Sequence, residues 1–271
     1  MGTSERGTTS TRVRRQQMLA LIRAQDFARI NDLSDRFGVS IVTIRNDLDE
    51  LAQGGQIRRV RGGAVPRILQ QSELPYEARE DDRAVEKALI AKAAVGLLSP
   101  GDSVILDVGT TSMAIAHELA ANTDLTDVTV LTWGLNIALA LEMAIPRMQV
   151  IVTGGILRPL QHSLVDSIAG LVLDRVRVSV ALVASNAVHP VRGVMTTNLP
   201  ESAMKQKMLS VAQRRVLVVD SSKFGQEALA HVCDLGDLDL IITAGKPDEK
   251  ILAVVRESVE VMVVDEASAQ A

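Results

Sequence analysis

Seven short apolar runs, rich in Val, Ile and Leu, constrain the fold of this chain more than any other feature. They occupy residues 103–108, 128–132, 149–153, 178–184, 215–220, 238–243 and 259–264. Runs of this length and composition are typical of strands that are buried on both faces. Helical segments separate most of them, at 113–121, 135–144, 164–175, 201–213 and 248–257. This alternation predicts an α/β domain with a mostly parallel sheet covered by helices.

The first 67 residues follow a different pattern of three short helices and a hairpin. The order helix, short helix, glycine turn, helix and hairpin predicts a winged helix-turn-helix, whose third helix can lie in a DNA major groove. The first predicted helix carries Met18, Leu19, Ile22 and Phe27 on its apolar face. The second is capped by Asn31 and ended by Gly38. The third is capped by Ser40, its apolar stripe is Val42, Ile44, Leu48 and Leu51, and strands follow at 56–60 and 63–66.

Charge is distributed unevenly between these two regions. The net charge of the 271 residues is -4, but residues 1–67 hold 12 Arg, no Lys and 7 acidic residues, a net charge of +5. The remainder holds 17 basic and 26 acidic residues, a net charge of -9. A basic head on an acidic body suggests that only the head meets a polyanion. Charge alone also fits a solvated basic face, and a three-helix unit also fits a dimerisation or protein-binding module.

The predicted DNA contacts fall into three groups. On the solvent side of the third helix, Arg45 suits the O6 and N7 atoms of guanine, and Asn46 suits the N6 and N7 atoms of adenine. Ser40 and Thr43 lie near the positive end of the same helix, which suits phosphate. The wing is expected to hold the DNA backbone or enter a minor groove through Arg58, Arg59 and Arg61.

The expected organisation is a disordered tail at 1–11, the winged helix-turn-helix at 12–67, a polar linker at 68–86 and the α/β domain at 87–267. No apolar run approaches the roughly 20 residues that cross a bilayer, and the N-terminus has no secretory pattern. Four scattered His and the single Cys233 give no metal-ligand spacing, so we expect no metal site and no cofactor. One cysteine forms no internal disulfide, which fits a cytoplasmic protein.

Polar groups at the ends of the predicted strands indicate a ligand site in the α/β domain. In a parallel sheet, ligands bind beyond the carboxyl ends of the strands. There Gly109, Thr110 and Thr111 follow the first strand, enter a helix and form an anion nest. Lys223, after a later strand, offers a point charge for phosphate. Each signal has a plainer explanation as a helix cap, a turn or a solvated lysine, so the prediction depends on their combination.

The stretch RRQQMLALIRAQDFARINDLSDRFGVSIVTIRNDLDELAQGGQIRRVRGGA resembles the N-terminal domain of the DeoR family of bacterial regulators, in its FGVS turn, TIRNDL helix and RGGA ending. The segment from YEAREDDRAVEKALIAKAA through DSSKFG resembles that family's effector domain. The resemblance implies a fold similar to sugar-phosphate isomerases such as ribose-5-phosphate isomerase, and a phosphorylated sugar or related metabolite as effector. The effector residues that it implies are Asp107, Gly109, Thr110, Thr111, Gly154, Gly155, Glu201, Lys205 and Lys223.

The chain departs from the family pattern at three places. Asn46 stands where the family has a second arginine, which implies a different base edge. Trp133 and Gly134 replace a polar pair after the second strand, and 179–182 differ from the usual Asp-x-Ala-Phe. Trp133 either stacks on a ligand or fills the core.

Three functional hypotheses follow. The first is a DNA-binding transcription regulator, expected to be a repressor, that is controlled by a phosphorylated metabolite. The second is a sugar-phosphate isomerase with a fused DNA-binding head, in which Asp107 or Glu201 moves the proton and Lys223 stabilises an enediolate. The third is a DNA-binding protein that has lost its ligand, which Trp133 motivates. In each, a homo-oligomer is expected, because one recognition helix reads few bases.

Overall fold

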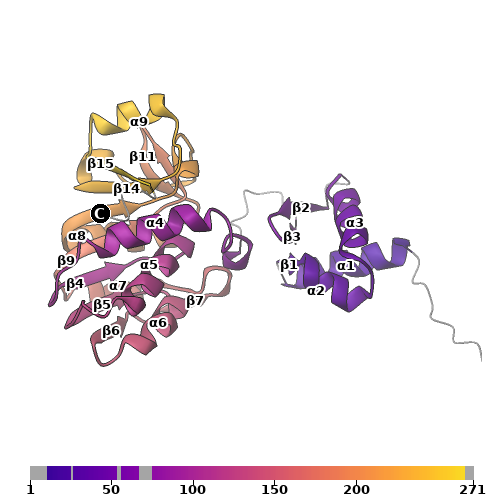
Figure 1. Cartoon of the computed structure of the whole chain (residues 1–271), viewed down its shortest axis with the longest axis horizontal. Coiled ribbons are helices and arrows are strands. Elements are labelled where there is room, and N and C mark those ends of the chain that lie inside the picture. Colours follow the sequence, from indigo (N-terminus) through magenta and orange to yellow (C-terminus); the bar gives the residue numbers. More distant parts are fainter. Residues whose placement is uncertain (1–10, 26, 54–55, 67–74, 266–271) are drawn as a thin grey trace, which may run out of the picture. The chain divides into compact units, whose positions relative to one another are not determined.

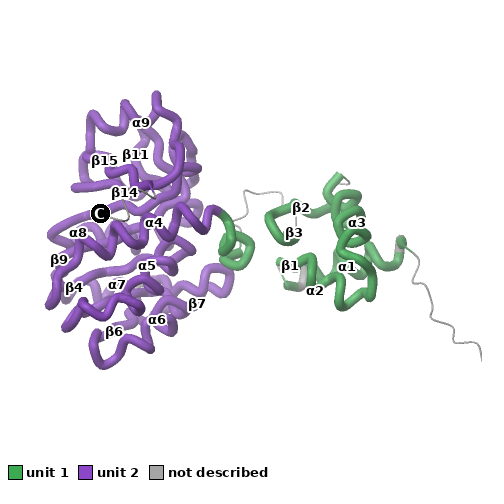
Figure 2. The backbone as a smooth tube through the Cα atoms, viewed as in Figure 1, with its two compact units in different colours: residues 1–82 green, residues 83–271 purple. Residues whose placement is uncertain are grey.

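The computed structural model describes residues 11–25, 27–53, 56–66 and 75–265. The chain divides into two compact units, residues 1–82 and residues 83–271, which Figure 2 shows in different colours. The predicted tail at 1–11 lies outside the described residues except for Thr11, which belongs to the first helix. Residues 68–74 of the predicted linker at 68–86 also lie outside them, whereas residues 75–86 are described.

The N-terminal unit is a winged helix-turn-helix, as the sequence predicts. Strand β3 lies between β1 and β2 in an antiparallel sheet, and β2 and β3 form the wing. The elements are α1 (Thr11–Gln25), β1 (Ala28–Arg29), α2 (Ile30–Phe37), α3 (Ile41–Gln53), β2 (Ile57–Val60) and β3 (Gly63–Pro66).

One apolar cluster holds these helices and the wing together. Met18, Ile22, Leu33, Ile44 and Leu48 are all fully buried in it. Because they recur at helical spacing, each helix turns one apolar stripe toward the others. Burying these side chains is the main favourable contribution to the folding of a unit this small.

The turn between α2 and α3 is set by one glycine. Gly38 has a φ of +64°, and its N–H donates to the carbonyl of Ser34 at the end of α2. Glycine adopts this left-handed conformation without steric cost, so the helix ends there as predicted. The side chain of Ser40 then accepts from the N–H of Thr43 at 3.2 Å, which caps α3.

Three local predictions in this unit are wrong. Phe27 is not part of the first helix, because α1 ends at Gln25. Helix α2 begins at Ile30 and is preceded by Arg29, so Asn31 lies inside the helix and does not cap it. Ile30 is buried, and its packing fixes the start of the helix more strongly than the capping preference of Asn31. Val42 is not part of the apolar stripe of α3, because 64% of it is exposed.

The C-terminal unit is built on a seven-stranded parallel sheet, which confirms the predicted fold class. All six strand pairs in it are parallel, in the order β15-β14-β12-β9-β4-β5-β6. Each predicted apolar run supplies one strand. The strands are β4 (Ser103–Leu106), β5 (Val128–Thr132), β6 (Met148–Val152), β9 (Val178–Ala184), β12 (Ala212–Val218), β14 (Leu240–Ala244) and β15 (Val261–Val264).

Helices cover both faces of this sheet (Figure 1). Alternate residues of each strand enter two separate cores, as Val104 and Ile105 of β4 do. Helices α4 (Ala84–Val95), α5 (Thr110–Ala121) and α6 (Leu135–Leu141) pack in one core. Helices α7 (Ser167–Leu173), α8 (Leu199–Val211) and α9 (Glu249–Arg256) pack in the other.

Two smaller antiparallel groups of strands were not predicted. Strands β7 (Ile156–Arg158) and β8 (Ser163–Val165) form a hairpin. Strands β10 (Ala187–His189), β11 (Gly193–Thr196) and β13 (Ala230–Cys233) form a three-stranded sheet that buries Cys233. Strands of three or four residues are too short to show a period of two in the sequence.

The boundary between the linker and the C-terminal unit also differs from the expected one. Helix α4 begins at Ala84, inside the predicted linker at 68–86, and the division between units falls between Asp82 and Arg83. Helix α4 contains many alanines and lacks a strong one-sided apolar stripe, which is why its first turn resembles polar linker in the sequence. Among the helices described, none is both long and apolar enough to pass through a bilayer.

Candidate functional site

Helix α3 separates a buried side from an exposed side. Ile44, Leu48 and Leu51 are buried, whereas Arg45 and Asn46 are exposed. The side chain of Arg45 makes none of the hydrogen bonds or ion pairs found among the described residues. The exposed side of α3 therefore presents the donor and acceptor groups that the sequence predicts for base recognition.

Asp47 belongs to the buried side and anchors α3 to α1. Its carboxylate accepts from Nε of Arg14 at 2.7 Å and from Nε of Arg15 at 2.8 Å. Burial alone would raise the pKa of Asp47, but the hydrogen bonds and charges of these two arginines lower it below its ordinary value. Asp47 therefore has a structural role, and the orientation of α3 depends on it.

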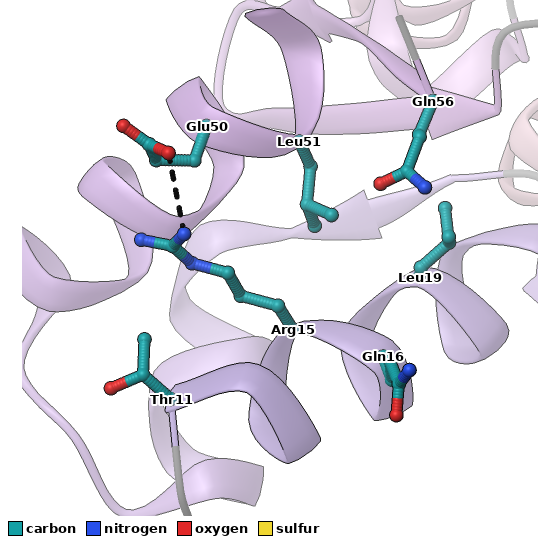
Figure 3. Close-up of a pocket in the computed structure, with 7 residues that line it drawn as sticks. All are labelled: Thr11, Arg15, Gln16, Leu19, Glu50, Leu51 and Gln56. Atoms are coloured by element: carbon teal, nitrogen blue, oxygen red, sulfur yellow. Dashed lines mark hydrogen bonds and ion pairs between the residues drawn. The ribbon is translucent and has the colours of Figure 1, made fainter. Parts of the chain in front are cut away.

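Arg15 also lines a hollow between α1 and the C-terminal half of α3. The hollow has a volume of about 440 Å³ and is drawn in Figure 3. There Arg15 also reaches Glu50, with 3.3 Å between Nη1 and Oε2. Because Arg15 is shared by two carboxylates of α3, this side of the helix is committed to packing within the unit. The lining residues are Thr11, Arg15, Gln16, Leu19, Glu50, Leu51 and Gln56.

The wing reaches back to the exposed side of α3. Arg59 pairs with Asp49 at 3.0 Å and donates to the backbone carbonyl of Arg45 at 3.0 Å. Arg58 is exposed on β2, and Arg61 donates to the carbonyl of Asp81 at 3.2 Å. Arg59 thus supports α3 from the wing. At the start of α3, Ser40 and Thr43 face each other with 2.9 Å between their hydroxyl oxygens.

In the C-terminal unit, the parallel sheet brings its carboxyl strand ends to one edge. Strands β12, β9, β4, β5 and β6 are neighbours in that order. Gly109 follows β4 with a φ of +102°, a conformation that favours glycine, and Thr110 and Thr111 open α5. Gly154 and Gly155 follow β6 with φ values of +74° and +127°. A side chain at Gly155 would meet the carbonyl of Val165 at 2.6 Å, so this glycine lets the backbone pack closely.

Three of the predicted residues form one buried cluster at this edge. Lys205 of α8 is 3% exposed, and its ammonium pairs with the buried carboxylate of Asp107. The same ammonium lies 5.5 Å from the centroid of the Trp133 ring, a cation–π distance. Asp107 also accepts from the N–H of Ala184 at 2.8 Å, which ties β4 to β9.

Two polar atoms of this cluster have no hydrogen-bond partner in the described part of the chain. They are Oδ1 of Asp107 and Nε1 of Trp133, and both are buried. An unpaired buried acceptor and an unpaired buried donor are costly, and such groups call for an explanation. Trp133 itself is 1% exposed, so it fills core space beside Lys205 and is not a surface platform.

Glu201 lies one helical turn before Lys205 and forms a second ion pair. Its carboxylate binds the guanidinium of Arg158, and the hydroxyl of Ser163 donates to it at 3.3 Å. Asn198 caps α8 by accepting from the N–H of Glu201 at 3.1 Å. Arg158 was not predicted as a site residue, because this arginine lies on the short strand β7 in a segment that has no recognisable motif.

Lys223 lies in a separate group at the end of β12. Its Nζ atom is 3.6 Å from Asp220, which Arg83 also approaches at 3.6 Å. Burial alone would raise the pKa of Asp220, but Lys223, hydrogen bonds from Ser222 and Arg83 lower it. Arg83 further pairs with Glu86 at 2.6 Å, so this group ties the start of the unit to the strand end. Within the described part of the chain, no hydrogen bond or ion pair joins this group to Lys205.

The described residues contain no group of three or more His, Cys, Asp or Glu placed to hold a metal ion.

Both units of the chain match known protein families. Residues 14–67 match the family model of the DeoR-like helix-turn-helix domain. Residues 82–245 match that of the DeoR C terminal sensor domain. The chain belongs to the DeoR family of transcriptional regulators.

Relatives in this DeoR family match nearly the whole chain. A putative aga operon transcriptional repressor of Escherichia coli O157:H7 is 36% identical over 97% of this chain and 97% of its own. The HTH-type transcriptional regulator GlpR of Haloferax volcanii is 34% identical over 93% of this chain and 96% of its own. Among solved structures, a D-ribose-5-phosphate isomerase aligns with 51% of this chain and 52% of its own, with 16% identity and a TM-score of 0.38.

As a DeoR-family member with a helix-turn-helix domain, this protein is a DNA-binding transcription regulator. The matched relatives are named regulators and repressors, which gives no support to the isomerase hypothesis. Both carboxylates considered for proton transfer are ion-paired, Asp107 with Lys205 and Glu201 with Arg158.

Proposed function

We propose that this DeoR-family protein is a repressor whose binding to operator DNA is changed by a phosphorylated sugar or a related metabolite. The DNA is read by the exposed side of α3, and the metabolite binds at the carboxyl edge of the parallel sheet. The observation that carries the proposal is the buried cluster of Lys205, Asp107 and Trp133 at that edge. A lysine ammonium is rarely buried this deeply unless it is paired, and the pairing with Asp107 keeps a positive charge available at this edge.

On the DNA side, the proposal assigns base contacts to Arg45 and Asn46 and phosphate contacts to Ser40, Thr43 and Arg58. Arg45 and Asn46 are exposed, on the same side of α3. Arg59 holds α3 through Asp49 and the Arg45 carbonyl, so it supports the reading helix from the wing. Arginine forms bidentate hydrogen bonds with guanine, whereas contacts to phosphate carry no sequence information.

On the effector side, the proposal is an exchange of anions. Lys205 and Arg158 each pair with a carboxylate of the protein, Asp107 and Glu201 respectively. A phosphate group can compete for these cations, and Gly109 to Thr111 offer it backbone N–H groups at the start of α5. The unpaired Asp107 Oδ1 and Trp133 Nε1 atoms suit a hydroxyl group, which both donates and accepts. A ligand that carries both phosphate and hydroxyl groups offers a partner to the two cations and to the two unpaired atoms.

We also propose that the protein acts as a homo-oligomer in the cytoplasm. One α3 helix spans a few base pairs, and two-fold symmetric dimers read two half-sites one DNA turn apart. The name of the Escherichia coli O157:H7 relative, an operon repressor, supports the repressor role.

The experiment is a gel-shift titration of the full chain. Duplexes are first selected from a randomised pool by the protein itself, and sugar phosphates are then added beside their unphosphorylated parents. We expect at least one phosphorylated sugar to change the apparent Kd while its parent sugar has no effect. Equal effects of both would exclude a phosphate site. No effect of any compound, together with no thermal shift, would favour the hypothesis that Trp133 has closed the site.

The same duplexes test the reading helix. Arg45→Ala is expected to cost about 1–3 kcal/mol on the selected sequence and to relax preference at one base pair. Arg58→Ala is expected to weaken binding to all duplexes alike and to reduce the dependence of binding on salt. Equal losses of the Arg45 variant on every duplex would make Arg45 a phosphate contact.

A further inference from the structure

The most exposed large apolar side chain in the described part of the N-terminal unit lies on α3. Val42 is 64% exposed, whereas Val13 of α1 and Ile41 are 42% and 41% exposed. A valine at this position gains nothing from packing, because the core of the unit is filled by Ile44, Leu48 and Leu51 on the opposite side of the helix. Single exposed apolar side chains are common in proteins, so the exposure of Val42 carries meaning only through the residues beside it on α3.

Val42 occupies the first turn of α3, on the same side as the predicted base-reading residues. Arg45 and Asn46 are three and four residues further along, which places their side chains next to Val42 on the helix surface. All three are exposed. In helix-turn-helix proteins, the N-terminal residues of the recognition helix are those that reach the base edges.

We infer that Val42 is a specificity-determining residue that contacts the 5-methyl group of a thymine in the major groove. Thymine is the one DNA base that presents a methyl group there, and an apolar side chain recognises it by excluding water. The isopropyl group of Val42 is branched at Cβ and therefore stiff, so it offers a fixed apolar surface at low entropic cost. This inference rests on the proposed role of α3 as the reading helix.

The geometry also predicts where the thymine lies. Because Val42 precedes Arg45 by one turn, the thymine is expected beside the base pair that Arg45 reads, within the same half-site. Asn46, on the same turn as Arg45, then reads the remaining neighbouring position. The selected duplexes should therefore contain a thymine next to the position at which Arg45→Ala relaxes preference.

The test combines a change in the protein with a change in the DNA. In duplexes selected by the full chain, each thymine is replaced in turn by deoxyuridine, which lacks only the methyl group. We expect one replacement per half-site to weaken wild-type binding about fourfold, the effect of one buried methyl group. Val42→Ala should weaken binding to the thymine duplex to a similar extent and should be insensitive to that same replacement.

A matched control variant makes the outcome decisive. Alanine is a better helix former than valine, so a loss of affinity in Val42→Ala does not come from unfolding of α3. Val13→Ala, on α1, is the matched control and should bind both duplexes like wild type. Two outcomes would overturn the inference. In the first, Val42→Ala binds the thymine duplex as tightly as wild type does. In the second, Val42→Ala loses affinity, but every deoxyuridine replacement weakens its binding as much as it weakens the binding of wild type.

The result also separates this inference from the role of α3 as a whole. If Arg45→Ala relaxes base preference while Val42→Ala behaves like wild type, α3 reads DNA without Val42. If neither variant changes the preference for the selected duplex over unrelated duplexes, then α3 is not the reading helix, and the proposed DNA contacts fail with it.

Discussion

The ammonium of Lys205 lies 5.5 Å from the ring centroid of Trp133, and both side chains are almost fully buried. Trp133 is the single tryptophan of the chain, so tryptophan fluorescence reports on the surroundings of this one position. A ligand phosphate that draws Lys205 toward itself is expected to change the Trp133 emission. Titration of the full chain with sugar phosphates measures this change, and Lys205→Met should abolish it. A response that persists in Lys205→Met would place the ligand elsewhere.

Breaking the ion pair between Asp107 and Lys205 is expected to destabilise the sensor unit. Asp107→Asn leaves the buried ammonium of Lys205 without its counter-charge, which should cost about 3 kcal/mol. Urea unfolding followed by Trp133 emission measures this cost. The double variant Asp107→Asn with Lys205→Met removes both charges and should recover part of the loss. A double variant less stable than Asp107→Asn would contradict this assignment.

Asp47 predicts a pH dependence for the N-terminal unit. Its pKa is lowered in the folded state, so the unfolded state binds the proton first as the pH falls. The stability contributed by Asp47 is thus complete well above about pH 4, the unfolded pKa, and is lost as the pH falls through the lower folded pKa. Asp47→Asn should lower the thermal midpoint at pH 7 and narrow the difference between pH 7 and pH 3.5. Circular dichroism of the full chain measures both.

The control for this prediction is Asp35→Asn, at an exposed position on α2. It should unfold like wild type at both pH values. If Asp47→Asn loses as much stability between pH 7 and pH 3.5 as wild type does, the arginine pairing of Asp47 does not contribute to acid sensitivity.

Lys223→Ala is expected to remove the response to the effector while leaving DNA affinity unchanged. The prediction follows from its place at the end of β12, where Asp220 holds it beside Arg83. A gel-shift titration with an active sugar phosphate tests it. Lys246→Ala removes an exposed lysine after β14 and should respond like wild type. An unchanged response in Lys223→Ala would exclude this residue from the site.

The sequence was most informative where one pattern repeats. Each of the seven strands contains a short run rich in apolar residues, so the parallel sheet and the edge at which Asp107 and Trp133 lie were predictable. The left-handed turn at Gly38 was also predictable, because few residues other than glycine adopt it easily. Local composition is enough to specify features of this kind.

Features that depend on tertiary contacts were not predictable. Val42 fits the spacing of an apolar stripe, and only the packing of α3 against α1 and α2 shows that it faces outward. The pairing of Arg158 with Glu201 joins residues 43 positions apart through a hairpin too short to show periodicity. The ion pair of Lys205 with Asp107 likewise depends on how α8 lies over the sheet.

The single cysteine is enclosed at the end of β13, and burial raises the pKa of its thiol to about 12. At neutral pH the thiol therefore stays protonated, and the thiolate, which is the form that attacks peroxides and disulfides, is scarce. Cys233 is therefore a poor target for oxidants. A redox response of this protein is not expected to run through its single cysteine.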